Sequence, residues 1–306
     1  MSFLDRIHTA NRYDLGRYLP FYIAGIRVGY VKTATVERLR AWPEVFTVRH
    51  DRVALAAELD RPDAAIDQRT EAVDEVLRSM HASGAITGWR DEPYPVAATP
   101  ADPALMRIER SALPVFGISG AGVHMNGFVL GPSGKVDREL RMWVARRARD
   151  KPTWPGAFDQ IVAGGQPAGL GVRENLAKEC WEEAGIVPGL ASCARAAGSV
   201  TYVYELDAFS SSDLPAGPAQ AGLRPDIVYC FDLELPADFE PVARDGEVES
   251  FELWSLERVM ATVEQTDAFK FNCSLVIIDF LLRHGFIGPE HPQYVQLCQG
   301  LHRSLD

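Results

Sequence analysis

The sequence has few cysteines, and their spacing gives them no evident partners. Its 306 residues include five, with no CxxC pair among them: Cys180, Cys193, Cys230, Cys273 and Cys298. A disulfide framework or a thiolate zinc site needs paired or closely spaced cysteines, so neither is indicated. We therefore expect reduced thiols, most of them buried.

The chain also lacks an excess of basic charge and any long apolar run. Its formal net charge of -11 disfavours nucleic acid polymers and anionic membranes as partners. The N-terminal segment has acidic residues and no signal-peptide core, and the most apolar run, CSLVIIDFLL, is short and interrupted by Asp279. These absences predict a cytoplasmic protein without a membrane span.

The composition is that of a globular protein, with 47% hydrophobic and 24% charged residues, and the length leaves room for two domains. Alternating helical and strand-like patterns predict a small α+β domain over residues 1–120. Residues 121–306 form the second predicted domain. The segment AATPADP, residues 97–103, is the best linker candidate because it is rich in proline and small residues.

The second domain has the clearer strand patterns. Strands are expected in five segments, 123–130, 140–148, 158–165, 198–209 and 226–236. A loop rich in Ser, Pro and Gly, residues 210–225, separates the last two, and helical patterns dominate the remaining chain. The sequence therefore predicts an α+β fold in which a mixed sheet is flanked by helices.

One short stretch concentrates negative charge. In AKECWEEAGI, residues 177–186, Glu179, Glu182 and Glu183 occupy positions i, i+3 and i+4. Each helical residue advances by about 100°, so these carboxylates share one face. Two like charges about 6 Å apart at an effective dielectric near 20 repel by roughly 2.8 kcal/mol, and a divalent cation turns this repulsion into attraction. Glutamate-rich stretches are also common on solvated helix faces, so the flanking residues must decide.

The flanking residues indicate a packed helix bounded by glycines. Gly171 suits the N-cap, with Glu174 three residues later, and Gly185 suits the left-handed position after the helix. Glu174 and Lys178 stand at i and i+4 in the favourable order for an ion pair. Four small or apolar residues share a flank that can pack: Leu176, Ala177, Cys180 and Ala184.

The stretch resembles the Nudix hydrolase signature, G-x5-E-x7-R-E-U-x-E-E-x-G-U, in which U is a bulky aliphatic residue. Six residues are in register with it: Gly164, Glu179, Glu182, Glu183, Gly185 and Ile186. Three positions depart from it: Leu170 replaces the first glutamate, Lys178 the arginine and Cys180 the first aliphatic. In the family that the stretch resembles, the glutamate at the position of Leu170 and the arginine at the position of Lys178 support the loop and helix. In this chain Glu174 and Lys178 are candidates for that role.

The resemblance extends over essentially the whole chain. The runs WPGAFDQIVAGGQPAG, PFYIAGIRVGYV and ERSALPVFGI look like those of Nudix proteins that are fused to thiamine pyrophosphokinase in fungi and stand alone in plants and bacteria. The resemblance implies a C-terminal α/β/α Nudix sandwich. It also implies hydrolysis of thiamine diphosphate, or of its oxidised oxo and oxy analogues, to the monophosphates.

A Mg²⁺ or Mn²⁺ site is implied by the same resemblance. Its ligand candidates are Glu179, Glu182, Glu183 and a backbone carbonyl at Gly164 or Gly165. Glu182 acts as a ligand or positions the attacking water. The metal would bridge the diphosphate and lower the pKa of bound water. A later loop often supplies a further glutamate in this fold; of Glu247 and Glu249 we prefer Glu247 as ligand or general base, because it follows the Asp-Gly turn.

Substrate contacts have weaker signals. Aromatic candidates for stacking on a heteroaromatic ring are Trp154, Phe158, Tyr202 and Tyr204, although strand aromatics usually belong to the core. Phosphate contacts are expected from Arg173, and from Arg146 and Arg147, unless these arginines only cover the surface. Arg224 and Asp226 either gate the site or cap it.

Two other functions fit the same sequence. A Nudix hydrolase of a nucleoside diphosphate derivative, such as ADP-ribose, NADH or an oxidised nucleotide, keeps the fold and the metal. A non-catalytic sensor would bind a phosphorylated metabolite, but a pure binder has no need of three mutually repelling carboxylates. The N-terminal domain covers the active site, mediates dimerisation or only adds stability, and a homodimer is one option for the assembly.

Overall fold

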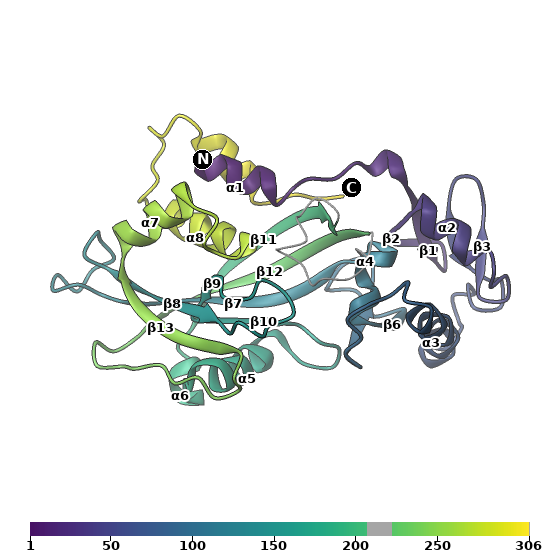
Figure 1. Cartoon of the computed structure of the whole chain (residues 1–306), viewed down its shortest axis with the longest axis horizontal. Helices are drawn as coiled ribbons and strands as arrows, with labels where there is room; N and C mark the ends of the chain where they lie inside the picture. Colours follow the sequence, from purple (N-terminus) through teal and green to yellow (C-terminus); the bar gives the residue numbers. More distant parts are fainter. Residues whose placement is uncertain (207–221, 306) are drawn as a thin grey trace.

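The computed structural model of the chain describes residues 1–206 and 222–305, and its strands form two groups (Figure 1). A seven-stranded sheet occupies the C-terminal region, from residue 120 onward. A four-stranded sheet and a two-stranded sheet occupy the N-terminal region, residues 18–109. The α+β fold class predicted from the sequence is confirmed. The loop expected at 210–225 lies largely outside the described residues.

The large sheet is mixed. Its strands are β7 (Gly120–Val129), β8 (Arg141–Arg147), β9 (Phe158–Gln160), β10 (Val162–Gly165), β11 (Arg195–Glu205), β12 (Leu223–Glu234) and β13 (Val248–Ser255). Their order is β11-β12-β7-β8-β13, with β10 paired to β7 and β9 to β8. Strands β12 and β7 run parallel, and the other pairs are antiparallel.

Helices cover both faces of this sheet (Figure 1). One face carries α5 (Val172–Ala184) and α6 (Pro188–Ala191), and the other carries α1 (Phe3–Thr9), α7 (Leu256–Gln265), α8 (Phe271–Arg283) and α9 (Tyr294–Gly300). Side chains of β7 alternate between the two layers: Val123 and Met125 pack with Cys180 of α5, and Phe128 packs on Phe280 of α8. The central strand is therefore buried on both faces.

The N-terminal region has its own core. Its four-stranded sheet has the order β2-β1-β4-β3, and a hairpin of β5 and β6 stands beside it. The elements are β1 (Tyr18–Ile23), β2 (Ile26–Lys32), α2 (Thr33–Leu39), β3 (Phe46–Val48), β4 (Val53–Leu55), α3 (Ile66–Ala82), β5 (Pro93–Val96), β6 (Met106–Glu109) and α4 (Leu113–Phe116). Strand and helix side chains such as Phe21, Leu77 and Ile108 share one buried cluster.

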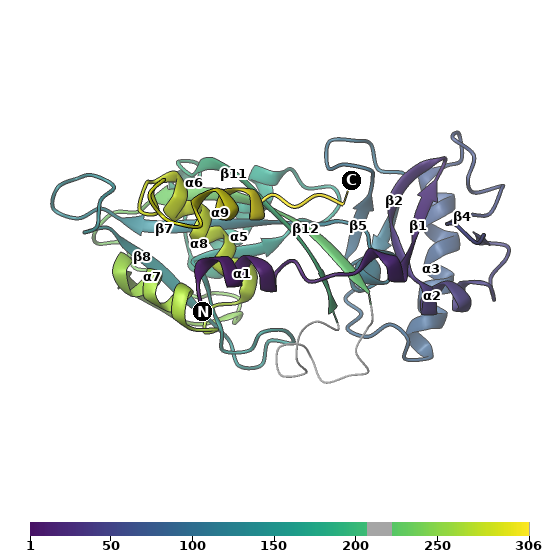
Figure 2. The same cartoon turned by 90° about the horizontal axis from the view of Figure 1, so that it is seen from above.

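The first helix departs from the predicted division at residue 120. Phe3 and Ile7 of α1 pack in the helical layer of the C-terminal region, and α1 lies beside α9 in that layer (Figure 2). Arg6 Nε donates a 2.7 Å hydrogen bond to the carbonyl of Val263. The chain therefore starts on the C-terminal region and only then enters the N-terminal sheet.

The predicted linker at 97–103 has a different place in the structure. It lies in the loop between β5 and β6, which pair with each other from Pro93–Glu109 to Val96–Met106. Because both strands belong to the N-terminal region, this loop does not join the two regions. The chain passes into the large sheet after α4, through residues 117–119.

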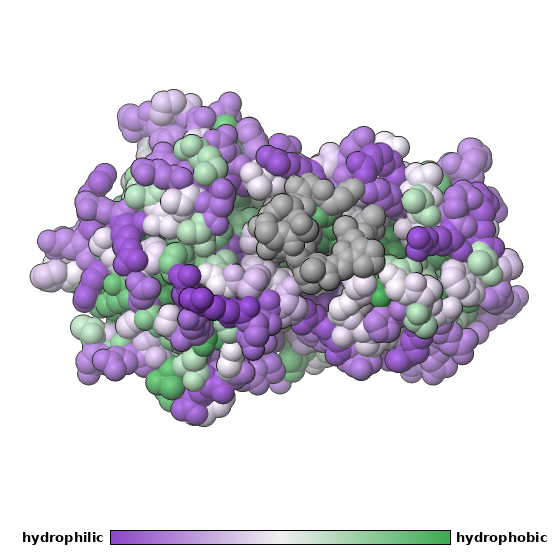
Figure 3. All heavy atoms as spheres, in the orientation of Figure 1, coloured by the Kyte–Doolittle hydropathy of each residue, from purple (hydrophilic) through white to green (hydrophobic). Residues whose placement is uncertain are grey.

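The molecular surface agrees with the composition. The face in Figure 3 is mostly hydrophilic, with apolar side chains in small groups. All five cysteines are free, and Cys180, Cys230 and Cys273 are buried. None of the helices within 1–206 and 222–305 has the length and apolar character needed to cross a membrane.

Candidate active site

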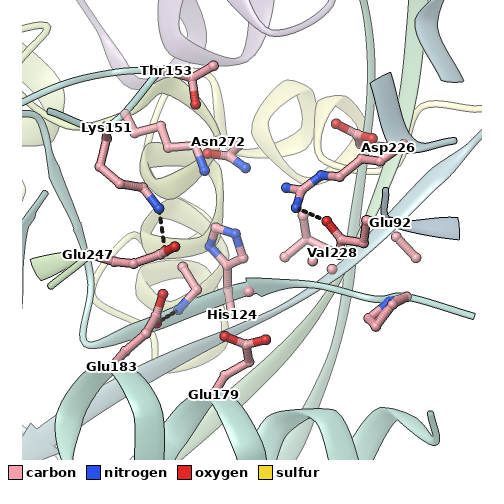
Figure 4. Close-up of a pocket in the computed structure, with 18 of the residues that line it drawn as sticks. Glu92, His124, Lys151, Thr153, Glu179, Glu183, Asp226, Val228, Glu247 and Asn272 are labelled. Atoms are coloured by element: carbon pink, nitrogen blue, oxygen red, sulfur yellow. Dashed lines mark hydrogen bonds and ion pairs between the residues drawn. The ribbon is translucent and has the colours of Figure 1, made fainter. Parts of the chain in front are cut away.

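A cavity of about 480 Å³ opens between the large sheet and the N-terminal region. It is lined by β10 and α5, by the loops before β9 and before β13, by β12, and by residues 90–94 with Arg110. Figure 4 shows Lys151 and Glu247 on one side, Glu92 and Asp226 on the other, and His124 between them. Because half of the lining residues carry a charge, the cavity suits a charged ligand.

Helix α5 supplies the acidic wall and has the predicted ends. Its N-cap is Gly171, whose N–H donates to the Glu174 carboxylate at 3.4 Å, and it is followed by Gly185 in the left-handed conformation at φ 65°. Glu174 does not pair with Lys178, because Lys178 instead bonds to Glu179 at 3.3 Å and to Glu182 at 2.6 Å. The expected support pair is thus replaced by a lysine that partly neutralises the glutamates themselves.

Glu183 is the most deeply placed of the three glutamates. It is only 7% exposed, and one carboxylate oxygen accepts a 2.7 Å hydrogen bond from the N–H of Ala163 in β10. Burial raises the pKa of Glu183 to about 8, the bond from Ala163 opposes that rise, and the nearby carboxylates of Asp159, Glu179 and Glu247 add to it. A positive ion in this position would stabilise the ionised carboxylate.

Glu183 meets two acidic side chains from the loop before β13. Carboxylate oxygens of Glu183, Asp245 and Glu247 lie within 4.8 Å of one another, close enough to hold one metal ion. Hard oxygen ligands of this kind select Mg²⁺ or Mn²⁺, so this donor set fits such an ion. Asp245 was not among the residues predicted for the site, although the Asp-Gly turn before Glu247 starts at this residue.

Glu179 and Glu182 lie on the same wall at different depths. The Glu179 side chain is 15% exposed, and burial raises the pKa of its carboxyl group. This side chain lies directly against the backbone of Gly164, where an added Cβ would overlap the carboxylate. The Glu182 side chain is 42% exposed at the rim. The carbonyl of Gly165, one of the two backbone candidates, accepts a 2.8 Å hydrogen bond from the Asn175 side chain.

His124, which the sequence analysis did not single out, lies in the middle of the cavity (Figure 4). Burial lowers its pKa to about 4, so the ring is neutral. Gln160 Nε2 donates to the Cys273 carbonyl at 2.9 Å, which turns Gln160 Oε1 toward His124 Nδ1 at 2.7 Å. Nδ1 therefore carries the proton, and Nε2 is left as an acceptor. The only signal in the sequence was the alternation of residues along the strand 123–130, which gives His124 the face opposite to Val123 and Met125.

A second group of possible ligands, His124, Asp159 and Cys273, is less suited to a metal. Asp159 is held by Arg147 at 2.8 Å and accepts a 2.8 Å hydrogen bond from the Cys273 thiol. Burial raises the pKa of Cys273 well above its usual value, whereas a metal binds the thiolate. This cluster therefore supports the floor of the cavity.

The opposite wall carries arginines paired with acids. Arg224 on β12 bonds to Asp226 at 2.9 Å, and Asp226 also accepts a 3.2 Å hydrogen bond from the Tyr202 hydroxyl. From the N-terminal region, Arg110 bonds to Glu92 at 2.8 Å. The cavity thus has an acidic end at α5 and a wall of three cations opposite, Arg90, Arg110 and Arg224.

Comparison with known proteins gives the family. A model described as the NUDIX domain matches residues 126–274, and one described as a domain of unknown function (DUF4743) matches residues 2–120. The chain is 40% identical to "Nudix hydrolase 20, chloroplastic" of Arabidopsis thaliana, over 98% of this chain and 77% of that protein. The chain belongs to the Nudix hydrolase family. It is a hydrolase of phosphorus-containing anhydrides, and its family generally needs divalent metals, commonly Mg²⁺ or Mn²⁺.

Two further relatives match nearly the whole chain. "Nudix hydrolase 24, chloroplastic" of Arabidopsis thaliana is 41% identical over 98% of this chain and 77% of that protein. An uncharacterized protein of Saccharomyces cerevisiae is 35% identical over 92% of this chain and 82% of that protein. Both matches extend over the N-terminal domain as well as the Nudix domain. The two domains therefore occur together in plants and yeast.

Of the four aromatic candidates, Tyr202 is the one that lines the cavity, although it is 2% exposed and its ring also packs on Phe271 at 5.3 Å. Trp154 and Phe158 lie outside its lining because they pack in the core, Trp154 on Phe271 at 5.4 Å and Phe158 on Trp254 at 4.7 Å between ring centres. Tyr204, also buried, packs on Phe271 at 5.0 Å. These three aromatics therefore serve the fold.

Arg173 also lies outside the cavity. Its guanidinium covers Phe231 and donates to the carbonyl of Ala194 at 3.2 Å. On a helix with about 100° per residue, Arg173 stands about 180° from Glu182, so it faces away from the acidic wall. Arg147 does line the cavity, but its side chain is held by Asp159 and by two loop carbonyls.

Glu247 lies just before β13 and Glu249 lies within it, and the two glutamates form different ion pairs. Glu247 lines the Nudix cavity and forms an ion pair with Lys151, whereas Glu249 is outside the lining and pairs with Arg149 at 3.5 Å. Burial tends to raise the pKa of Glu247, but the hydrogen bond and charge of Lys151, with Arg147 and Arg110, hold it below its usual value. Glu247 is therefore ionised at neutral pH.

Lys151→Met is expected to shift the acidic limb of the kcat/KM profile to higher pH. The change removes the cation that lowers the pKa of Glu247, so this carboxylate binds a proton at a higher pH than before. The profile should be measured from pH 5 to 9 at saturating Mg²⁺. Lys135→Met, in an exposed loop outside the cavity, is the control, and equal profiles for both variants would contradict the role of Lys151.

Proposed function

We propose that this Nudix protein hydrolyses the diphosphate bond of thiamine diphosphate, or of its oxidised oxo and oxy analogues, to the monophosphate and phosphate. The observation that carries the hydrolytic part is one cavity in which the acidic group Glu183, Asp245 and Glu247 faces a wall of arginines. A metal diphosphate needs both kinds of partner. Water gains a bond to phosphorus, the bridging P–O bond breaks, and phosphate leaves.

The acidic group would hold the divalent cation. Glu183 is the central ligand, Asp245 and Glu247 approach it from the loop before β13, and Glu179 adds negative charge from the neighbouring turn of α5. When bound, such a cation neutralises charge on the phosphates and lowers the pKa of a water molecule. Glu182, at the rim, would position water through its carboxylate, and Glu247 would serve either as a ligand of the cation or as the base that takes the proton from the water.

The organic part of the substrate would lie along the other wall. The cavity lining there includes Tyr94, Tyr202 and Val228, which are each 2–3% exposed and would therefore meet the organic group only with their edges. Burial raises the pKa of Tyr94 to about 12, so its phenol stays protonated and remains a hydrogen-bond donor. The choice of thiamine diphosphate rests on the resemblance of the whole chain, including the run WPGAFDQIVAGGQPAG.

A panel of diphosphates tests this proposal. Purified protein with Mg²⁺ should be given thiamine diphosphate, its oxo and oxy analogues, ADP-ribose and NADH, and the products should be separated by chromatography. We expect the highest kcat/KM for a thiamine-type diphosphate, with the monophosphate as product. A higher value for ADP-ribose or NADH would favour a nucleotide substrate, and tight binding of any compound without turnover would favour a sensor.

Location and assembly stay predictions from the sequence. A cytoplasmic site is expected for this chain, whereas the names of the two plant relatives place those proteins in the chloroplast. A homodimer would appear as twice the mass of one chain, 33.8 kDa, in light scattering.

A further inference from the structure

The N-terminal domain reaches into the Nudix cavity with charged side chains. Arg90, Glu92, Tyr94 and Arg110 all line it. Buried Glu109 fixes this group, because its carboxylate accepts hydrogen bonds at 3.0 Å from the backbone N–H groups of both Arg90 and Glu92. The segment is therefore held in place from within the N-terminal domain, and its arginines are presented to the cavity on a rigid support.

Arg110 and the acidic wall lie on either side of strand β10. A Cβ on Gly164 would overlap the carboxylate of Glu179, and a Cβ on the next residue, Gly165, would overlap the Tyr94 hydroxyl and lie 3.5 Å from the guanidinium carbon of Arg110. Consecutive residues of a strand are about 3.3 Å apart along its axis. Successive residues of a strand direct their Cβ atoms to opposite sides, so Glu179 and Arg110 flank β10 from its two sides, and both line the same cavity.

The charges on this wall favour an anion. Burial lowers the pKa of Arg90 and the charges of Arg110 and Arg224 lower it further, while the carboxylates of Glu92 and Glu247 partly oppose this shift. Within residues 1–206 and 222–305, Arg90 has no ion-pair partner. The charge of Arg110 also acts on Glu247 across the cavity. An oxyanion between the arginines and a cation held by the acidic group would reduce the repulsion among the arginines, and the cation would reduce the repulsion among the carboxylates.

We propose that Arg110 of the N-terminal domain, held by Glu92, binds a phosphate oxygen of the substrate diphosphate in the Nudix cavity, with Arg90 as a second cation at the rim. This assignment rests on the proposed function as a diphosphate hydrolase. It gives the N-terminal domain a part in substrate binding. A guanidinium suits the task because its planar donors match phosphate oxygens, and Glu92 leaves donors of Arg110 free to turn toward the ligand.

A purely structural role for the ion pair between Arg110 and Glu92 does not explain why both side chains are partly exposed in the cavity. Both residues belong to the N-terminal domain, so their pair does not join the two domains. Both side chains are about one third exposed, at 31% and 30%, and both face the cavity. The partial exposure leaves room for a ligand contact.

Binding of methylenediphosphonate, which has no hydrolysable bridge, tests the assignment on the full chain with Mg²⁺. Calorimetry should compare wild type, Arg110→Gln and the matched control Arg107→Gln, an exposed arginine on β6 that pairs with Asp67 outside the cavity. We expect the affinity to fall about 10- to 100-fold in Arg110→Gln and to change less than about twofold in Arg107→Gln, because a hydrogen bond to a charged group is lost only in the former. Equal affinities in the two variants would overturn the proposal.

Two further measurements show whether a lower affinity of Arg110→Gln comes from misfolding or from the lost phosphate contact. Thermal unfolding shows whether Arg110→Gln still folds. If it does not, Arg110→Lys replaces it, and we expect its affinity to fall by more than the roughly twofold change allowed for Arg107→Gln, because a lysine keeps the charge but lacks the planar donors. In kinetic assays, KM should rise more than kcat falls. Because the diphosphonate is not a substrate, its binding tests the arginine even if no natural diphosphate is turned over, so the two proposals fail separately.

Discussion

Glu183→Gln is expected to lower kcat about 1000-fold. Glutamine keeps the shape of the side chain and removes the charge with which Glu183, Asp245 and Glu247 would hold a divalent cation. A bound metal supplies several kcal/mol of charge stabilisation, and each 1.4 kcal/mol or so corresponds to about tenfold in rate. The measurement is kcat at saturating substrate and Mg²⁺, for the best diphosphate of the panel.

The same variant should change how stability depends on pH. The Glu183 carboxyl has a pKa of about 8 in the folded chain against 4.5 for the ordinary group, so the folded state binds more protons between these values. Without metal, stability therefore falls as pH rises from about 4.5 to about 8. Glu183→Gln should remove this loss, which makes it more stable than wild type at pH 8 in EDTA. Mg²⁺ should raise the Tm of wild type and leave that of the variant almost unchanged.

Glu234→Gln is the control for both measurements, since Glu234 is exposed at the end of β12 and outside the cavity. We expect its kcat and its pH dependence of Tm to match wild type. If Glu183→Gln keeps the wild-type kcat, Glu183 does not bind the catalytic metal. A low kcat together with an unchanged Mg²⁺ effect on Tm would instead give Glu183 a role in positioning alone.

Gly164→Ala is expected to lower kcat/KM about 100-fold. The added methyl group would overlap the carboxylate of Glu179, so that side chain must leave its place beside the acidic group. Misplacing a group at a catalytic site by about 1 Å can cost about 100-fold. The test is kcat/KM over a range of Mg²⁺ concentrations, where we expect a higher Mg²⁺ requirement as well as a lower maximum.

Gly189→Ala is the matched control for this substitution. Gly189 lies in α6, outside the cavity, and a Cβ there would meet no atom within 4 Å. Its Tm and kcat/KM should stay near those of wild type. If Gly164→Ala has wild-type kcat/KM at every Mg²⁺ concentration, Glu179 has no part in metal binding.

Local patterns were sufficient for the acidic helix. Gly171, Glu174 and Gly185 act at the ends of α5 as their positions predicted, because helix caps depend on a few neighbouring residues. The buried flank with Leu176, Cys180 and Ala184 also follows from helical spacing alone. The pairing of Lys178 with Glu182 instead of Glu174 was not predictable, since both partners stand at the same spacing.

The sequence by itself determined the fold class, the helix that carries Glu179, Glu182 and Glu183, and the charge that needs a cation. The helix and its charge depend on residues within one or two turns of each other, and the fold class depends on the succession of such local patterns along the chain. Only the tertiary structure decided that Asp245 joins Glu183 and the predicted Glu247 in the acidic group, and that Arg110 of the N-terminal domain lines the same cavity. Such contacts join residues far apart in the chain, and their geometry is set by the packing of sheets and helices, which no local pattern records.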